Sequence, residues 1–121
     1  MLLGLRTAIY PVSDIAKAKA WYSQVTGTQP YFDQPFYVGF EVGGFELGLV
    51  PRGTPGSTGP QPLWGVENAS STKDRLLELG ATLLEDVQDV GGGIRVGAVL
   101  DPCGNRLGFI ENPGFDTSKV R

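Results

Sequence analysis

The sequence predicts an α+β fold made of two similar halves, and three observations support this. Each half reads in the order strand, helix, strand, strand, strand. The spacing repeats, because Asp14 stands thirteen residues before Gly27 and Glu67 stands thirteen before Gly80. Apolar-glycine pairs recur in the last two strands of each half: Val38-Gly39, Leu47-Gly48, Val96-Gly97 and Leu107-Gly108. An internal duplication accounts for all three observations.

The length and composition fit one globular domain. The chain has 121 residues, of which 40% are hydrophobic and 19% are charged, and such a chain buries about two-thirds of its surface on folding. Residues 51–62 are rich in Pro, Gly, Ser and Thr and predict a connector. We expect a single domain over 1–121, with module one at about 1–50, module two at about 63–112 and a polar tail at 113–121.

The charge and hydropathy of the sequence argue against a nucleic-acid-binding or membrane-spanning protein. The net charge is -3 and no run of Lys or Arg occurs, so we expect no binding to nucleic acid. The apolar stretches are too short to cross a membrane, and the first six residues lack the pattern of a secretory signal. Cys103 is the single cysteine, which favours a reducing compartment. We therefore expect a cytoplasmic protein.

Local signals place the elements of the first half. Apolar residues at helical spacing predict a helix over 15–25, with Ser13 and Asp14 as its N-cap and Gly27 as the residue that ends it. Gly43 and Gly44 lie between two β-rich segments and predict a tight hairpin turn. The predicted strands are 5–12, 29–33, 36–42 and 45–50.

The second half follows the same order. Ser70 and Ser71 are predicted to cap a helix over 72–79, which Gly80 ends. The glycines at 91–93 and the turn formers at 101–105 predict the two remaining turns. The predicted strands are 63–67, 81–87, 94–100 and 106–111.

The chain contains no histidine, and this excludes several kinds of active site. A Ser-His-Asp triad, a Cys-His pair and an imidazole metal site are all impossible. Any metal would have to bind carboxylates, amides and water. Cys103 lies in a polar turn, and we interpret it as an incidental turn residue.

Three stretches together resemble a known family. They are AIYPVSD at 8–14 with AWY and VTG at 20–22 and 25–27, WGVEN at 64–68 with LGA at 79–81, and the turn LDPCGNRL at 100–107. In this order they resemble the vicinal oxygen chelate superfamily, which includes glyoxalase I, bleomycin-resistance proteins and extradiol dioxygenases. The resemblance implies two βαβββ modules whose strands form a curved sheet around a shared cavity.

The resemblance also implies where metal ligands would lie. The four positions that match the family pattern are Thr7, Gly48, Gln61 and Gly108. Glycine offers no side-chain ligand, a threonine hydroxyl is a poor one, and Gln61 alone cannot hold a divalent ion. We therefore expect no metal and no cofactor.

Strand alternation predicts which side chains face the cavity. The Gly43-Gly44 turn pairs Glu41 with Glu46. The candidate ligand-binding residues are Thr7, Tyr37, Gly39, Glu41, Glu46, Gly48, Gln61, Arg95, Gly97, Arg106 and Gly108. The four glycines at mirrored positions would leave empty volume for a ligand, or would mark bends in a curved sheet. The aromatic side chains expected at the cavity mouth are Tyr10, Tyr31, Phe32, Phe36 and Tyr37.

The charged candidates allow two interpretations each. Glu41 and Glu46 could supply a general base or a weak cation site, or could lie in water near the hairpin end. Arg95 and Arg106 could hold an anionic group, or could be surface charges.

Two functions from different classes are the leading hypotheses. The first is metal-free binding of a small hydrophobic or aromatic molecule, as the resemblance to bleomycin-resistance proteins implies. The alternative is a glyoxalase- or dioxygenase-like enzyme with atypical metal ligands. A regulatory or protein-interaction domain is a third hypothesis. We expect a homodimer, since members of this family often dimerise.

Overall fold

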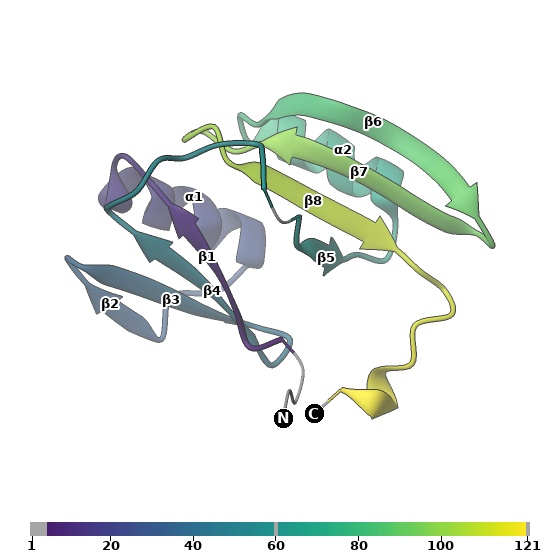
Figure 1. The fold of residues 1–121 in the computed structure, drawn as a ribbon, viewed down its shortest axis with the longest axis horizontal. Coiled ribbons are helices and arrows are strands. Elements are labelled where there is room, and N and C mark those ends of the chain that lie inside the picture. Colours follow the sequence, from purple (N-terminus) through teal and green to yellow (C-terminus); the bar gives the residue numbers. More distant parts are fainter. Residues whose placement is uncertain (1–4, 60, 121) are drawn as a thin grey trace. The chain divides into compact units, whose positions relative to one another are not determined.

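The structure is a computed structural model, and it describes residues 5–59 and 61–120. The chain divides into two compact units, the first running to Pro55 and the second beginning at Gly56. Each unit contains one helix and one open four-stranded sheet in the order β-α-β-β-β (Figure 1). The predicted α+β fold of two βαβββ modules is thereby confirmed. Within the described ranges, neither α-helix is long and apolar enough to span a bilayer.

The first unit forms a mixed sheet with one helix. Its strands lie in the order β1-β4-β3-β2, with β1 parallel to β4 and the other neighbours antiparallel. Its elements are β1 (Thr7–Pro11), α1 (Ile15–Thr26), β2 (Phe32–Gln34), β3 (Tyr37–Val42) and β4 (Phe45–Val50).

Both ends of α1 are closed as the sequence predicts. The Asp14 side chain accepts a hydrogen bond from the backbone N–H of Lys17 at 3.1 Å, which satisfies one of the free donors of the first turn. Gly27 follows the helix with a φ of 71°, and its N–H donates to Ser23 O at 3.0 Å.

The β3–β4 hairpin has the predicted turn and the predicted register. Gly43 and Gly44 have φ angles of 59° and 90°, which a two-residue turn between twisted strands requires and which glycine adopts without strain. This turn places Glu41 opposite Glu46 and Gly39 opposite Gly48.

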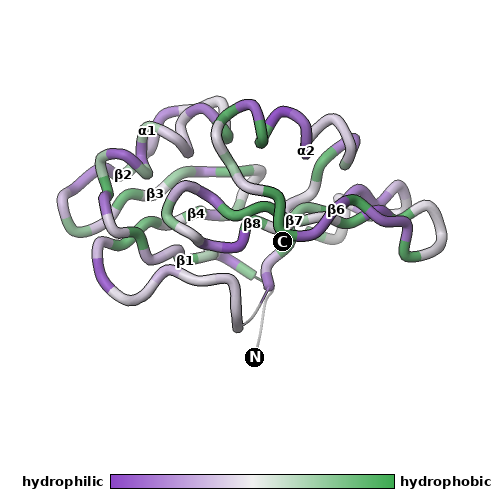
Figure 2. Tube along the Cα trace, turned by 90° about the horizontal axis from the view of Figure 1, so that it is seen from above, coloured by the Kyte–Doolittle hydropathy of each residue, from purple (hydrophilic) through white to green (hydrophobic). Residues whose placement is uncertain are grey.

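The two faces of this sheet differ sharply. Val38, Phe40, Leu47 and Leu49 share one face and are 2% exposed or less. This face packs against α1, which contributes buried side chains from Ala18, Trp21 and Tyr22, and Figure 2 shows α1 lying along it. Burial of each large side chain contributes roughly 1.5–3 kcal/mol. The opposite face, which α1 does not cover, carries Gly39, Glu41, Glu46 and Gly48.

The second unit repeats this arrangement, but one of its edge strands is ten residues long. Its strand order is β5-β8-β7-β6, and β5 is parallel to β8. Its elements are β5 (Leu63–Gly65), α2 (Ala69–Glu78), β6 (Thr82–Gly91), β7 (Ile94–Leu100), β8 (Arg106–Glu111) and a 3₁₀ turn in the tail, η1 (Thr117–Lys119). The edge strand β6 runs four residues past its predicted end, with three irregularities in its pairing to β7.

The cap of α2 differs from the prediction. Asn68, rather than Ser70 or Ser71, is the N-cap, and its side chain accepts from the Ser71 N–H at 2.9 Å. The Glu111 carboxylate accepts from the Ala69 N–H at 2.9 Å. The helix therefore starts three residues earlier than predicted, because two acceptors outside the serine pair satisfy its first-turn donors.

The register of β7 and β8 also corrects a prediction. Gly97 pairs with Phe109 and Ala98 pairs with Gly108, so Gly97 and Gly108 lie on opposite faces of the sheet. Val99, Leu107 and Phe109 are buried on the face toward α2. Arg95 and Gly97 share that face, whereas Arg106 and Gly108 lie on the other.

The turn between β7 and β8 is held by a buried carboxylate. Asp101 is 4% exposed and accepts from the N–H groups of Cys103 and Asn105 at 2.9 and 2.8 Å. Asn105 in turn accepts from Gly56 N–H at 3.0 Å, and Arg106 N–H donates to Gly56 O at 3.2 Å. The start of the second unit is thus fixed to this turn.

Candidate functional site

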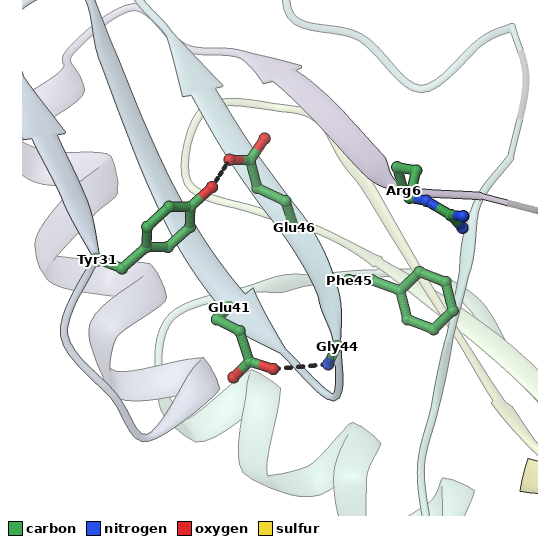
Figure 3. A pocket seen from close by; sticks show the side chains of 6 residues that line it. All are labelled: Arg6, Tyr31, Glu41, Gly44, Phe45 and Glu46. Atoms are coloured by element: carbon green, nitrogen blue, oxygen red, sulfur yellow. Dashed lines mark hydrogen bonds between the residues drawn. The ribbon is translucent and has the colours of Figure 1, made fainter. Parts of the chain in front are cut away.

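Four polar side chains converge on the face of the first sheet that α1 leaves uncovered. The carboxylate of Glu46 accepts three hydrogen bonds. Thr7 Oγ1 donates to Oε1 at 2.8 Å, the Tyr37 hydroxyl donates to the same oxygen, and the Tyr31 hydroxyl donates to Oε2. Figure 3 shows the Tyr31–Glu46 bond. We refer to Thr7, Tyr31, Tyr37 and Glu46 as the Glu46 cluster.

The fold brings the cluster together from four segments. Parallel pairing of β1 with β4 sets Thr7 beside Glu46. Tyr37 begins β3, and its side chain lies on the same face by alternation. Tyr31 precedes β2 and is fixed there by its N–H, which donates to Gly39 O at 3.0 Å.

Gly39 and Gly48 make room for the cluster. A Cβ on Gly39 would lie 2.8 Å from Glu46 Oε2 and 3.3 Å from Tyr31 Cε1, and a Cβ on Gly48 would lie 2.8 Å from Tyr37 Cζ. Both distances of 2.8 Å are too short for real carbon contacts. The two glycines therefore admit the protein's own side chains close to the sheet.

In the second unit, side chains likewise occupy the space beside Gly97 and Gly108. A Cβ on Gly97 would lie 2.8 Å from the Phe109 ring, and one on Gly108 would lie 2.7 Å from Leu63 Cδ2. The prediction that these four glycine positions leave empty volume is therefore wrong. Neighbouring side chains occupy the space beside each of them.

Hydrogen bonding shifts the acid–base behaviour of the cluster. Partial burial raises the pKa of Glu46, but the bonds from Tyr31, Tyr37 and Thr7 outweigh it, and the pKa lies below its ordinary value. The pKa of Tyr31 is raised, first by its bond to the Glu46 carboxylate. Burial and then the same carboxylate raise the pKa of Tyr37. The stable state is one carboxylate among neutral hydroxyls.

The carboxylates of Glu41 and Glu46 accept hydrogen bonds from different partners. The two residues are opposed in register, as predicted. Glu41 accepts from the Gly44 N–H at 2.6 Å, at the hairpin turn, while Glu46 accepts from the Tyr31 hydroxyl (Figure 3). Of the two interpretations for Glu41, the geometry favours a carboxylate at the hairpin end.

An open pocket of about 280 Å³ lies at this end of the hairpin. Its lining residues are Arg6, Tyr31, Glu41, Gly44, Phe45 and Glu46. Arg6 and Phe45 point away from the Tyr31–Glu46 pair in Figure 3, and the Arg6 guanidinium donates to Leu5 O at 3.2 Å. The polar end of the pocket is therefore formed by the two carboxylates and the Tyr31 hydroxyl.

Apolar and aromatic side chains flank the cluster. Ile9 pairs with Gly48 and Phe32 pairs with Gly39, so both lie on the face of the cluster, and they are 54% and 40% exposed. The Phe32 ring meets the Phe36 and Tyr37 rings edge-on, each at 6.1 Å between centroids. Tyr10, predicted for the cavity mouth, is instead buried against Tyr22.

The remaining predicted residues belong to the second unit. Arg106 forms a two-pronged ion pair with Glu85, at 3.0 and 2.9 Å. Arg95 is exposed on the face toward α2, and Gln61 is exposed just before β5. Of the predicted set, the first unit joins Thr7, Tyr37 and Glu46 over Gly39 and Gly48.

A family model covers most of the chain. It describes the glyoxalase/bleomycin resistance protein/dioxygenase superfamily and matches residues 4–109. The protein belongs to this superfamily, as the sequence stretches predict. A search of curated proteins finds no match.

Solved structures share the fold. A glyoxalase/bleomycin resistance protein from Catenulispora acidiphila is 25% identical, with a TM-score of 0.66 over 91% of this chain and 100% of that one. A glyoxalase-related enzyme from Fulvimarina pelagi is 20% identical, with a TM-score of 0.75 over 93% and 90%. A lactoylglutathione lyase from Agrobacterium tumefaciens is 20% identical, with a TM-score of 0.73 over 93% and 98%.

The residues present do not fit the metal centre that the family resemblance implies. Among residues 5–59 and 61–120, no three His, Cys, Asp or Glu side chains gather closely enough to hold an ion. The Thr7 hydroxyl already donates to Glu46, and Tyr37 occupies the space that a side chain at Gly48 would need. Neither position can act as a ligand without rearranging the cluster.

Proposed function

We propose that the protein binds a small hydrophobic or aromatic molecule, without a metal, on the uncovered face of the first sheet. The observation that carries this proposal is a fixed polar cluster beside exposed apolar side chains. Small-molecule sites commonly combine an apolar surface with a few precisely placed polar groups. The Glu46 cluster supplies the polar groups, and Ile9, Phe32 and the tyrosine rings supply the surface.

The apolar part favours a flat ligand. Ile9 and Phe32 project from the two edge strands of the same face, on either side of Gly48 and Gly39, and covering apolar area contributes roughly 25 cal/mol per Å². Contact between aromatic rings adds about 0.5–1.5 kcal/mol when they meet edge-on or offset. An aromatic molecule would gain both contributions.

The electrostatics favour binding over proton transfer. A general base works best with a pKa near the working pH. The pKa of Glu46 is shifted down and those of Tyr31 and Tyr37 are shifted up, so all three groups become poorer at exchanging protons at neutral pH. This supports a recognition site over a catalytic acid–base pair. The name of the Catenulispora acidiphila neighbour, which includes bleomycin resistance, is consistent with this class.

Titration with naphthalene-ring compounds tests the proposal. We expect chemical-shift changes in ¹⁵N-labelled protein to cluster on β1, β2, β3 and β4, with saturation in calorimetry. The substitution Phe32→Ser should weaken binding several-fold, because it removes the exposed ring. Leu84→Ser is the matched control, since Leu84 is an exposed apolar residue of the second unit. Absence of saturable binding, or equal weakening by both substitutions, would contradict the proposal.

We also propose that the protein is a cytoplasmic homodimer. The support is the acidic, cysteine-poor composition and the exposed apolar side chains Phe36 and Leu63. Light scattering on the purified chain distinguishes a dimer from a monomer by mass. A monomer at the concentrations where the ligand binds would contradict the dimer and leave the binding proposal intact.

A further inference from the structure

We infer that the Glu46 cluster selects ligands that present a hydrogen-bond donor, above all a protonated amine joined to an aromatic ring through a carbon atom. This inference rests on the proposed function and specifies its ligand class. It follows from counting the donors and acceptors that the cluster leaves unused.

The cluster uses all its donors internally. A tyrosine hydroxyl has one hydrogen, and those of Tyr31 and Tyr37 both point to Glu46. The Thr7 hydroxyl hydrogen is used in the same way. These three side chains therefore have no hydroxyl hydrogen left to offer a ligand.

The acceptors, in contrast, are not all used. An ionised carboxylate has about four lone-pair positions, and Glu46 fills three of them. The phenol oxygens keep their own lone pairs as well. A ligand group that only accepts hydrogen bonds would meet acceptors alone, whereas a donor would find a free partner.

The charge of Glu46 is not neutralised by a neighbouring cation. In the part of the chain that the structure describes, no Lys or Arg nitrogen lies within ion-pair distance of Glu46. Arg6 points away from the Tyr31–Glu46 pair, and Lys19 pairs with Asp33 at 3.0 Å. A cationic donor would therefore gain more than a neutral one, since it adds the attraction between opposite charges to the hydrogen bond.

Exposed apolar side chains on the same face provide contact area for the ring of such a ligand. A ring on the ligand can pack on Phe32 or Ile9 while its amine reaches Glu46.

Three naphthalene compounds with matched rings test the inference. They are 1-naphthylmethylamine, 1-naphthylmethanol and 1-naphthoate, which present a cationic donor, a neutral hydroxyl and an anionic acceptor. At pH 7 we expect the amine to bind about tenfold more tightly than the alcohol, and the carboxylate to bind most weakly. Tighter or equal binding of 1-naphthoate would overturn the inference.

Matched substitutions locate the effect. Glu46→Gln keeps the shape but replaces one acceptor oxygen with a donor, and it should remove most of the preference for the amine. Asp33→Asn removes the same charge from the opposite face of β2 and should leave the preference unchanged. Equal loss in both variants would show a general charge effect and reject the inference. Circular dichroism confirms that each variant is folded.

The two proposals fail in distinguishable ways. If none of the three compounds binds, the proposed function itself is wrong. If all three bind with similar affinities, the binding face exists and only the donor selectivity is wrong. Repeating the titrations at 0.05 and 0.5 M NaCl separates a short-range bond to Glu46, which persists, from long-range attraction, which salt screens.

Discussion

The phenol of Tyr37 lies in the space that a side chain at Gly48 would occupy. The two residues come from adjacent strands, and the missing Cβ lets the ring approach the sheet and reach Glu46. The glycine at position 48 in β4 is therefore needed for the polar cluster that we propose as a binding site. This relationship also explains why the space beside the glycines of this face is not available to a ligand.

The substitution Gly48→Ala should destabilise the protein and disturb the cluster. A Cβ 2.8 Å from Tyr37 Cζ forces the ring to move, and overpacking of this kind costs about 1–3 kcal/mol. Urea unfolding measures the loss. Gly65→Ala in β5 is the control, because a Cβ there meets nothing within 4 Å, and it should change stability little. An unchanged free energy of unfolding in Gly48→Ala would show that Tyr37 can move away without cost.

Stability should depend on acid pH through Glu46. The native pKa is lowered from its ordinary 4.5, so folding favours the ionised carboxylate. The contribution of the Glu46 carboxylate to stability is fully present at pH above its ordinary pKa, and it disappears as the pH falls through the lowered native pKa. The wild type should therefore exceed Glu46→Gln in unfolding free energy at pH 7, with the difference shrinking by pH 3. An unchanged difference across this range would contradict a charged Glu46.

The two tyrosines of the cluster should titrate late and respond differently to Glu46→Gln. Both native pKa values lie above the ordinary 10.0, so the stabilisation is present at neutral pH and is lost as pH rises through the raised values. The carboxylate bond is the largest cause for Tyr31, whereas burial is the largest for Tyr37. The pKa of Tyr31 should thus return further toward 10.0 than that of Tyr37, as ¹³Cζ shifts would show. Equal changes would reject this division of causes.

Removal of metal should leave the protein unchanged. Excess EDTA is expected to alter neither the melting temperature nor the amide spectrum, because the matched ligand positions are glycines, Gln61 and the hydrogen-bonded Thr7. Elemental analysis of protein purified without added metal gives the direct measurement. A stoichiometric transition metal, lost with EDTA together with stability, would contradict the proposed metal-free site and favour the alternative of an enzyme with atypical ligands.

The sequence predicts those features that depend on local signals. The Gly43-Gly44 turn allows one favourable pairing, so the β3–β4 register follows from it. The β7–β8 connection contains five residues over 101–105, and such a length does not determine which strand residues face each other. A one-residue difference there moved Gly97 to the face toward α2.

The composition of the cluster was only partly predictable. Thr7, Tyr37 and Glu46 follow from strand alternation, because each lies in a strand whose register was predicted or implied. Tyr31 was expected only as an aromatic near the cavity mouth. Its hydroxyl reaches Glu46 from a segment before β2, and no periodic pattern determines where such a side chain points. Its closeness to Gly39 in space was the missing information.

Glu46 and Arg106 occupy matching places in the two units. Glu46 lies two residues before Gly48 of β4, which pairs with β1, and Arg106 lies two residues before Gly108 of β8, which pairs with β5. One holds a negative charge among hydroxyls, and the other holds a positive charge against Glu85. Two identical copies of a single module would be forced to carry the same residue at both places. Joining the copies in one polypeptide removes that constraint, so each half could specialise in the opposite polarity without altering its backbone.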